Sequence, residues 1–590
     1  MRIGIRALTL LAVLSAVYAC LRLFTGFSFY DDEGSLILMS RWLLDGHAVY
    51  GEFNSVYGPF YFLYERIAHM LAGGSASHTA TRMFAVLPWV ATCVLAFGYT
   101  LRTTRSVAAA MVTWLAVLRT MAFLAAEPGH PQEICVLLLC AVVALSLSHK
   151  TSRLAAAGAV VAALALTKIN LGVFAGSGLL LAMAGTLPEG RTRRMVLPLI
   201  GMLCFVAPAG LMLSLIATPW VWACCSLLAA SIFSVVVTLS WVPTETASGW
   251  RAWRSLAMGF LLCASLVVGW SLAQGASLTA MLRSTVLANL EQSHTWTVPL
   301  PLGIWGPLAG MAGVIAAGFR LSGWRERQFE WLRLAIGVLT LAAVIANRPA
   351  IAFALALPFI WMVLLPGEST ALGPWPRSVL ACVTVMQAMA VYPVAASQLR
   401  FTMVLISISA AQITHDAWIA LARRSYWNPR VVRRFETAAM VFALGGYLFS
   451  AGSAFAHYTR LSPLDLRGTA GIHIDPEDRA TYHWIVSRTQ KSCDSLVSFP
   501  AMPSLYFWTG MMPPVYPDVD GWQAYTNTER QAIERRILSS PRACVVVVDK
   551  LMSFWLPNIN QSQPTLLGFI RDHFVETDRH LGFHFLERKH

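Results

Sequence analysis

The composition of this chain of 590 residues is that of a membrane protein. Hydrophobic residues make up 56% of the sequence and charged residues only 13%, whereas soluble domains carry about 25% charged residues. Apolar runs of roughly 17 to 25 residues, the length that an α-helix needs to cross a bilayer, recur between Ala7 and Ala456. The sequence therefore excludes a purely soluble protein.

The apolar runs predict a polytopic α-helical bundle of about fifteen transmembrane helices. We expect the spans at residues 7–24, 81–101, 106–124, 132–148, 154–167, 171–187, 195–217, 220–241, 255–273, 301–319, 333–346, 350–365, 378–395, 400–420 and 436–456. An odd number of crossings places the two termini on opposite sides of the membrane. Two longer segments outside the bilayer, residues 25–80 and 274–300, are too amphipathic to be simple linkers.

The formal net charge of +14 could indicate nucleic-acid binding, but the positions of the basic residues argue against it. They gather in alternate short loops, which is the positive-inside pattern of membrane proteins. These residues are Arg102, Arg105, Lys150, Arg153, Arg191, Arg193, Arg194, Arg251, Arg254, Arg320, Arg325, Arg327 and the stretch from Arg423 to Arg434. The pattern places the N-terminus in the cytoplasm and the first loop outside, with helix 7–24 retained as a signal-anchor.

Residues 457–590 are expected to form a water-soluble α/β domain outside the cytoplasm, after a transmembrane domain of residues 1–456. Helices at 476–489 and 527–538 alternate with strands at 495–499 and 544–549. Cys493 and Cys544 could pair in an oxidising compartment, but their spacing does not decide whether they do. Aromatic residues of this domain could stack on sugar rings or form its core; they are Tyr506, Phe507, Trp508, Tyr516, Trp522 and Tyr525.

The first loop carries the strongest chemical signal in the sequence. Asp31, Asp32 and Glu33 follow one another directly after the first span. An amphipathic stretch from Ser35 to Leu44 is expected to form a helix at the membrane interface, and a second one follows from Tyr57 to Ile67. The three carboxylates could be a solvated boundary of the membrane, but a mere connector would not require the aromatic and turn residues that follow them.

These first-loop residues resemble the GT-C superfamily of membrane glycosyltransferases, in the branch of protein mannosyltransferases and aminoarabinose transferases. Those enzymes place an Asp, often followed by Glu, in the first external loop. The resemblance implies transfer of a sugar from a polyprenyl-phosphate donor to a protein, lipid or glycan acceptor at the outer face. It makes Asp32 the general base, with Glu33 beside it and Asp31 as the alternative, because a positioned carboxylate can accept the proton of an attacking hydroxyl.

The second external loop is short and polar, and in the resembled family it faces the same cavity as the first. Glu127, His130 and Glu133 are therefore candidates for binding the acceptor or a divalent cation, Mg²⁺ or Mn²⁺. The alternative is a turn with solvated ends, since the spacing is not diagnostic of a metal site. Tyr57 and Tyr61 of the first loop are expected to line the same substrate site.

Lys168 interrupts an apolar stretch of the sequence, and Asn170 follows it closely; both are candidates for binding the substrate. A charge that faces lipid is costly, so such a lysine usually has a partner; the resemblance implies that this partner is the lipid-linked phosphate. The alternative is that Lys168 extends to the membrane interface. Arg283 and Arg348 are further candidates for binding the substrate from outside the bilayer.

Two other classes of protein compete with the glycosyltransferase hypothesis. A secondary transporter or lipid flippase should concentrate polar helix breaks near the middle of the bilayer, whereas this chain places its carboxylates at one edge. A noncatalytic envelope assembly protein would not need the acidic cluster. The sequence contains no Walker motif or dinucleotide-binding fingerprint, which argues against ATP-driven transport and nucleotide-sugar donors. The architecture favours the plasma membrane of a bacterium.

Overall fold

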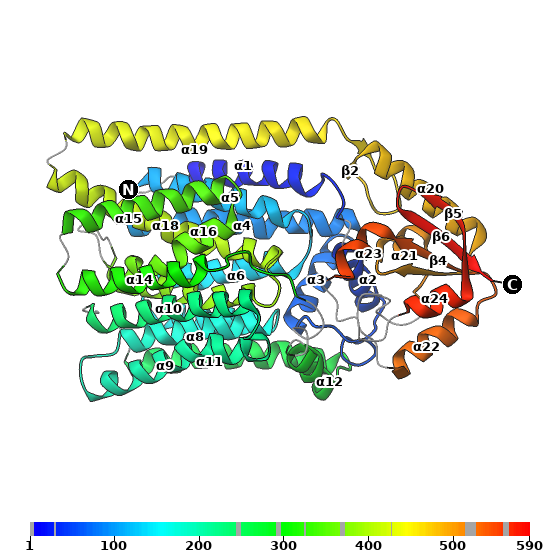
Figure 1. Cartoon of the computed structure of the whole chain (residues 1–590), viewed down its shortest axis with the longest axis horizontal. Coiled ribbons are helices and arrows are strands. Elements are labelled where there is room, and N and C mark those ends of the chain that lie inside the picture. The colour runs from blue at the N-terminus through cyan, green and yellow to red at the C-terminus, as the bar shows by residue number, and fades with distance from the viewer. Residues whose placement is uncertain are drawn as a thin grey trace.

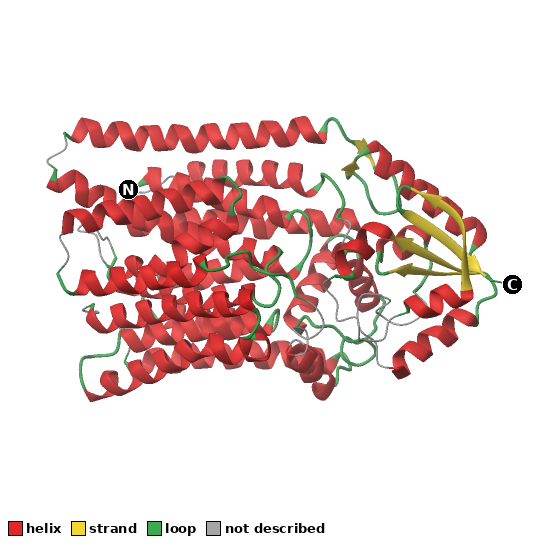
Figure 2. Cartoon of the chain, in the orientation of Figure 1, coloured by secondary structure: helices red, strands yellow, loops and turns green. Residues whose placement is uncertain are grey.

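A long helical bundle carries an α/β domain at one end (Figure 1). This computed structural model describes residues 5–28, 31–242, 249–288, 290, 297–323, 326–365, 372–425, 428–513, 527–557 and 566–589. The strands gather in the C-terminal domain, while the rest of the drawn chain is mainly helical (Figure 2). The structure confirms the predicted combination of a polytopic bundle with a C-terminal α/β domain.

Every predicted span coincides with a helical segment. In the described part of the chain, nine helices are long and apolar enough to cross a membrane. They are α1 (Ile5–Leu23), α4 (His78–Thr104), α5 (Val107–Leu124), α9 (Arg191–Met212), α10 (Pro219–Trp241), α11 (Trp250–Ala273), α15 (Glu326–Ile345), α18 (Ser397–Arg424) and α19 (Pro429–Tyr458).

Shorter helical segments fill the other predicted spans. Some of these change from α-helical to 3₁₀ geometry partway along, as in the pairs α16–η3 and α17–η4. The shorter segments are α6 (Pro131–Leu145), α7 (Thr151–Ala165), α8 (Ile169–Gly185), α14 (Trp305–Leu321), α16 (Pro349–Ala356), η3 (Leu357–Leu364), α17 (Pro374–Gln387) and η4 (Ala388–Val391). Side chains from most of these helices share one buried apolar core.

The two ends of the bundle differ in charge and in what covers them. We call the end that faces the C-terminal domain the domain end, and the opposite end the basic end. Helices α4 and α18 end in basic-rich loops at the end away from the C-terminal domain, whereas α2, which begins at the carboxylates of the first loop, lies beside that domain (Figure 1). The alternation of loop charge therefore corresponds to a real separation in space.

Two helices between α1 and α4 cover the domain end. They are α2 (Asp32–Leu44) and α3 (Pro59–Leu71), close to where the amphipathic pattern predicts helices. Ile37 and Leu38 of α2 pack into the core of the C-terminal domain, while Leu36 and Met39 pack in a separate apolar cluster with residues of α3. Helix α2 is thus enclosed between the C-terminal domain and α3. The prediction of a helix at the membrane interface did not include these two protein contacts.

The C-terminal domain is built on a four-stranded sheet of order β3-β4-β6-β5. Strands β3 and β4 are parallel, and β6 pairs antiparallel with both β4 and β5. The strands are β1 (Ser462–Pro463), β2 (His473–Ile474), β3 (Ser495–Phe499), β4 (Ala543–Val548), β5 (Phe574–His580) and β6 (Phe583–Arg588). The helices are α20 (Pro476–Ser492), α21 (Ser504–Thr509), α22 (Asn527–Leu538), α23 (Asp549–Trp555) and α24 (Leu567–His573).

The predicted helices and strands of this domain all lie within a few residues of the observed ones. Cys493 and Cys544 form a disulfide, which settles the alternative that the sequence left open. They can pair because Cys493 lies two residues before β3 and Cys544 lies on the neighbouring parallel strand. Tyr506, Phe507 and Trp508 are buried in the core of the domain. The other aromatic candidates, Tyr516, Trp522 and Tyr525, lie outside the described residues.

Candidate active site

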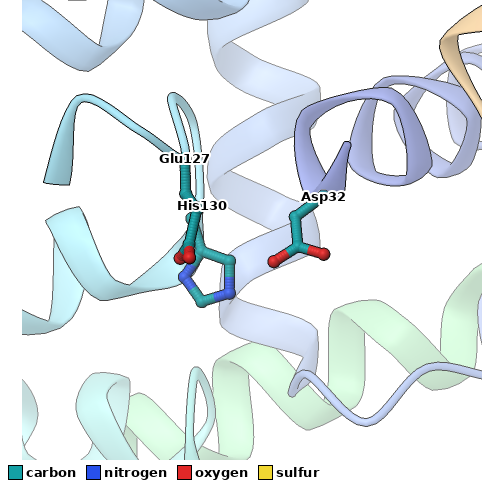
Figure 3. A group of neighbouring side chains, drawn as sticks. All are labelled: Asp32, Glu127 and His130. Atoms are coloured by element: carbon teal, nitrogen blue, oxygen red, sulfur yellow. The ribbon is translucent and has the colours of Figure 1, made fainter. Parts of the chain in front are cut away.

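The three adjacent carboxylates of the first loop have different surroundings. Asp31 is buried and caps α2, accepting hydrogen bonds from the Gly34 N–H at 3.1 Å and from Ser504 of the C-terminal domain. Glu33 is buried against Arg82 of α4, which donates to both of its oxygens at 2.8 and 2.7 Å. Asp32, at the first position of α2, is half-buried on the side that faces the second loop (Figure 3).

Opposing electrostatic effects act on the two buried neighbours of Asp32. Burial raises the pKa of Asp31 to about 8, with a contribution from the Glu33 carboxylate and against the hydrogen bonds from Ser504 and Gly34. Burial alone would also raise the pKa of Glu33, but the charges of Arg82 and His78 outweigh it and lower this pKa to about 2. Glu33 is therefore ionised and paired, whereas Asp31 holds its proton near neutral pH.

Asp32 converges with two side chains of the second loop. One ligand atom each from Asp32, Glu127 and His130 lie within 4.8 Å of one another. Figure 3 shows the Asp32 carboxylate at the start of α2 directed toward Glu127 and His130, which come from the connection between α5 and α6. The structure thus brings together residues of the two loops that the resemblance places at one cavity.

The second loop is held in place by buried hydrogen bonds. Glu133 accepts from the indole N–H of Trp89 at 2.8 Å and from the Gly129 N–H at 3.1 Å. The hydroxyl of Tyr61 donates to the Gly129 carbonyl at 3.1 Å. Both Glu133 and Tyr61 therefore support the backbone that carries Glu127 and His130, and their described hydrogen bonds do not reach Asp32.

Hydrogen bonds orient the imidazole of His130. Its Nδ1 accepts from the Gln132 N–H at 3.2 Å, which leaves Nε2 to share a hydrogen bond of 2.9 Å with the Tyr57 hydroxyl. Burial lowers the pKa of His130, and the charge of Lys168 lowers it further. The ring is neutral as a result, and Tyr57 is the residue through which the first loop fixes it.

Lys168 reaches the site because α3 packs directly on the turn between α7 and α8. The N–H of Gly58 donates to the Thr167 carbonyl and that of Phe60 to the Leu166 carbonyl, both at 2.9 Å. This contact brings the Lys168 ammonium to 5.6 Å from the centre of the Tyr57 ring. Lys168 also interacts electrostatically with Glu127 and Asp32, so it belongs to the same site.

Helix α18 contributes two polar residues that the sequence analysis did not select. The uncharged side chain of Ser397 forms a hydrogen bond with Glu127. Its hydroxyl also accepts a hydrogen bond from the Gln132 side-chain amide at 2.9 Å. Arg400 also interacts with Glu127, and its guanidinium lies 5.5 Å from the centre of the Phe123 ring. The polar residues around the start of the run at 400–420 were the available signal, but nothing in the sequence connects that run to the second loop.

Three predicted substrate-binding residues stay outside this group. The Asn170 side chain accepts from the N–H of Leu171 at 2.9 Å, a local contact in the first turn of α8. Arg283 is exposed in the short π-helical turn η2 (Arg283–Leu287), after α12 (Leu278–Leu282). Arg348 is exposed at the start of α16. All three lie in the part of the chain that the structure describes, and none has a described contact with Asp32, Glu127 or His130.

The donor set of the site fits a divalent cation. Two carboxylates and one neutral imidazole suit Mn²⁺ better than Mg²⁺, which prefers oxygen ligands in an octahedral arrangement. Both nitrogens of His130 already take part in hydrogen bonds, so ligation by its Nε2 would replace the contact with Tyr57. Asp32 and Glu127 are therefore the residues that would hold the cation, with His130 completing the set.

Comparison with solved structures identifies the architecture. ArnT from Cupriavidus metallidurans, in a crystal structure bound to undecaprenyl phosphate, matches with a TM-score of 0.52 at 13% sequence identity, over 98% of this chain and 97% of that chain. The chain has an ArnT-like fold. An oligosaccharyltransferase from Archaeoglobus fulgidus, tethered to an acceptor peptide, matches with a TM-score of 0.45 at 10% identity, over 99% of this chain and 74% of that chain. No protein-family model matches the sequence, and no curated protein matches it either.

The ArnT-like fold confirms the resemblance that the first-loop residues indicated. A transmembrane bundle and a C-terminal mixed α/β domain are present in the predicted order. The identity of 13% establishes the fold and leaves the chemistry to the side chains of this chain.

Proposed function

We propose that this protein is a GT-C glycosyltransferase that moves a sugar from a polyprenyl-phosphate donor to an acceptor hydroxyl or amine. The observation that carries the proposal is the convergence of Asp32, Glu127 and His130 within 4.8 Å, beside Lys168, on an ArnT-like fold. The ArnT crystal structure contains undecaprenyl phosphate, and a lipid of this class supplies the leaving group in our proposal.

Asp32 is the general base of the proposed reaction. As the acceptor oxygen or nitrogen forms a bond to the anomeric carbon, its proton passes to the Asp32 carboxylate, and the bond between that carbon and the phosphate oxygen breaks. The electron pair of that bond leaves with the polyprenyl phosphate. Asp32 suits this role better than Asp31 or Glu33, because it is only half-buried and lies against Glu127 and His130, whereas the other two carboxylates are fully buried.

Two cations support departure of the phosphate. Lys168 and Arg400 both interact with Glu127, so they lie on the same side of the site. The charge that develops on the leaving phosphate would be stabilised by these groups, which are already in place before the reaction. Glu127 and His130 orient the acceptor in this arrangement. A divalent cation held by Asp32 and Glu127 would supply further positive charge for the phosphate.

The proposed orientation follows from the charge of the two ends. We infer from the positive-inside pattern that the basic end faces the cytoplasm; in this proposal the site, the C-terminal domain and the Cys493–Cys544 disulfide lie outside. A disulfide is expected on that side, since extracytoplasmic compartments are oxidising. The acceptor is therefore a component of the cell envelope that is accessible from the outer face of the membrane.

Transfer of radiolabelled sugar from polyprenyl phosphates tests the proposed function. We expect Asp32→Asn to lower the rate at equal folded amount by at least about 100-fold, the usual contribution of a general base. The matched control is Asp45→Asn, because Asp45 lies at the other end of α2 with its side chain 59% exposed. A parallel assay with EDTA measures the contribution of a divalent cation.

The other outcomes separate the competing functions. Full transfer by Asp32→Asn together with an inactive Asp31→Asn would move the base to Asp31. Absence of transfer in the wild-type protein, with each class of polyprenyl-phosphate sugar, would favour the transporter or the assembly protein over an enzyme.

A further inference from the structure

The C-terminal domain contacts the residue next to the proposed base. Ser504, the first residue of α21, donates its backbone N–H to Asp31 Oδ2 at 2.7 Å and its hydroxyl to Asp31 Oδ1 at 2.6 Å. Asp31 Oδ1 also accepts the Gly34 N–H, so one carboxyl group joins the start of α2 to the start of α21. Asp31 and Ser504 are both buried, and their contact is shielded from water.

The backbone at Asp31 requires such support. Its φ of 54° lies in the left-handed region, which is unfavourable for residues other than glycine, although Asp tolerates it better than most. A strained residue of this kind persists only where its surroundings hold it in place. The next residue is Asp32, so the backbone at Asp31 fixes the direction in which the Asp32 side chain leaves α2.

Helices α2 and α21 pack closely at Gly34. A Cβ atom at Gly34 would lie 2.4 Å from the Ser504 backbone nitrogen and 2.5 Å from its hydroxyl oxygen. Only glycine permits this approach of α21 to α2. The sequence Asp31-Asp32-Glu33-Gly34 thus contains both the acceptor for Ser504 and the space that Ser504 occupies.

Further contacts hold α21 against the bundle. Phe507 and Trp508 pack edge-on or tilted against His78 at the start of α4, each with ring centres 5.7 Å apart. At the other side of the domain, the His473 N–H donates to the Phe24 carbonyl at 3.0 Å and the Gly26 N–H donates to the His473 carbonyl at 2.7 Å. The domain is therefore anchored to the chain on both flanks of the first loop.

We propose that Ser504 and Asp31 are positioning residues of the transferase, and that the C-terminal domain sets the orientation of Asp32 through them. This inference rests on the proposed role of Asp32 as the base. The domain is then part of the catalytic apparatus, although none of its residues needs to contact the sugar. Misplacement of a catalytic group by about 1 Å can lower a rate by about 100-fold, so a contact of this kind has a measurable effect.

Ser504→Ala, Asp31→Asn and the double variant test the inference. We expect Ser504→Ala to lower kcat about 10-fold and Asp31→Asn about 10- to 100-fold, with the donor KM within about twofold of wild type. The double variant should be no worse than Asp31→Asn alone, because both substitutions remove the same contact. Ser487→Ala is the control, since Ser487 is an exposed serine on α20 of the same domain.

Hydrogen exchange provides a readout that does not depend on activity. In Ser504→Ala, amide exchange should rise in the first turn of α2 but not in α6, and the melting temperature should change little. A Gly34→Ala variant, which forces α21 away from α2, should show the same exchange pattern and the same loss of kcat.

Each other result overturns either this inference or the proposed function. Wild-type kcat in both single variants, with Asp32→Asn inactive, would eliminate the positioning role and leave the proposed base intact. Losses that multiply in the double variant, or that follow the folded fraction, would show that the two residues act separately or only through stability. Transfer by Asp32→Asn at the wild-type rate would remove the proposed base, whatever the exchange data show.

Discussion

Asp31, Asp32 and Glu33 are adjacent in the sequence, but their side chains have different partners in the structure. The sequence presents three equivalent acidic residues. In the structure, Asp31 is tied to Ser504, Glu33 is tied to Arg82, and Asp32 faces Glu127 and His130. The two buried neighbours hold the first turn of α2 from both sides, and this leaves only Asp32 of the three directed toward the second loop.

The pair of Glu33 and Arg82 gives a prediction at this scale. Arg82 is 1% exposed and also donates to the Leu23 carbonyl at 2.7 Å, so Glu33→Gln would leave a buried cation without its counter-ion. We expect this substitution to lower the free energy of unfolding by about 3 to 5 kcal/mol, seen as a lower melting temperature in detergent. Glu52→Gln is the control, because Glu52 is exposed and pairs with exposed His47. An unchanged melting temperature in Glu33→Gln would contradict the importance of the pair.

The raised pKa of Asp31 predicts that the stability of the protein depends on pH. Its pKa is raised from 3.8 to about 8 in the folded protein, so the folded state binds this proton more tightly than the unfolded state does. The resulting stabilisation is fully present below about pH 4 and is lost as the pH rises to about 8. The melting temperature of the wild type should fall across the upper part of this range, and that of Asp31→Asn should fall less. Parallel curves for the two proteins would show that Asp31 does not keep its proton.

At the scale of helices, the packing of α3 on the turn between α7 and α8 brings Lys168 into the site. Pro59 begins α3 and needs no hydrogen-bond partner for its nitrogen, while Gly58 lets the backbone approach the turn. A Cβ atom at Gly58 would lie 2.1 Å from the Leu166 carbonyl oxygen. Tyr57 and Lys168 are neighbours only because these two backbones touch.

Gly58→Ala should therefore separate Lys168 from the site. We expect the KM for the polyprenyl-phosphate donor to rise about 10-fold, because a charge-assisted contact contributes about 1.5 to 3 kcal/mol and only part of it would be lost. The measurement is the dependence of the transfer rate on donor concentration. Gly98→Ala serves as the control, since a Cβ atom at Gly98 in α4 would have no neighbour within 4 Å. Equal KM values in the two variants would argue against Lys168 as a phosphate ligand.

The helices and strands could be predicted from the sequence, and their contacts could not. Apolar runs and the alternation of the C-terminal domain depend on local chemistry, which is why the segments at 81–101 and 495–499 coincide with α4 and β3. The contacts of Ser504 with Asp31 and of Arg400 with Glu127 join residues hundreds of positions apart. The resemblance selected Asp32, but only the fold distinguishes its surroundings from those of Asp31.

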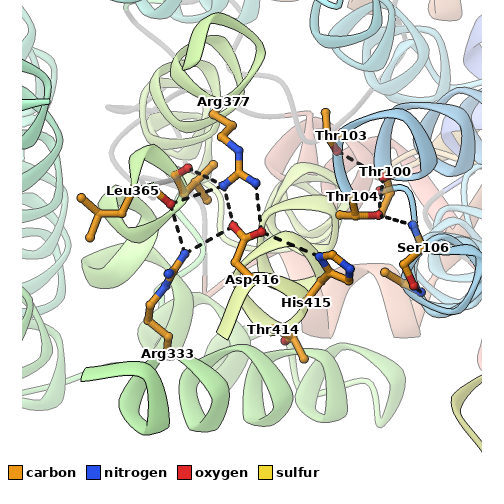
Figure 4. A network of polar contacts seen from close by, with 12 residues as sticks. Thr100, Thr103, Thr104, Ser106, Arg333, Leu365, Arg377, Thr414, His415 and Asp416 are labelled. Atoms are coloured by element: carbon orange, nitrogen blue, oxygen red, sulfur yellow. Dashed lines mark hydrogen bonds and ion pairs between the residues drawn. The ribbon is translucent and has the colours of Figure 1, made fainter. Parts of the chain in front are cut away.

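At the scale of the whole molecule, the two ends of the bundle contain different groups of polar residues. The domain end carries the proposed site. Near the basic end, a buried ionic network joins α15, α17 and α18 around Asp416, which accepts from Arg377 at 3.0 Å and from Arg333 at 3.4 Å (Figure 4). Arg333 also pairs with Glu330 at 3.2 Å and donates to the Leu365 carbonyl at the end of η3. The charges of the two guanidinium groups equal those of the two carboxylates. The network therefore joins α15, α17 and α18 without a net charge among these four groups.

Asp416→Asn should destabilise the bundle without changing the chemistry of the site. Removal of the Asp416 carboxylate leaves Arg377 without its described counter-ion, whereas Arg333 keeps Glu330; breaking a buried pair costs about 3 to 5 kcal/mol. We expect a lower melting temperature in detergent, together with a transfer rate per folded molecule close to that of the wild type. The control is Asp494→Asn, because Asp494 pairs with Arg542 on the exposed surface, where solvent screens the pair. A loss of rate per folded molecule comparable to that of Asp32→Asn would mean that the two ends of the bundle are coupled, and that the network near the basic end takes part in setting the geometry of the site.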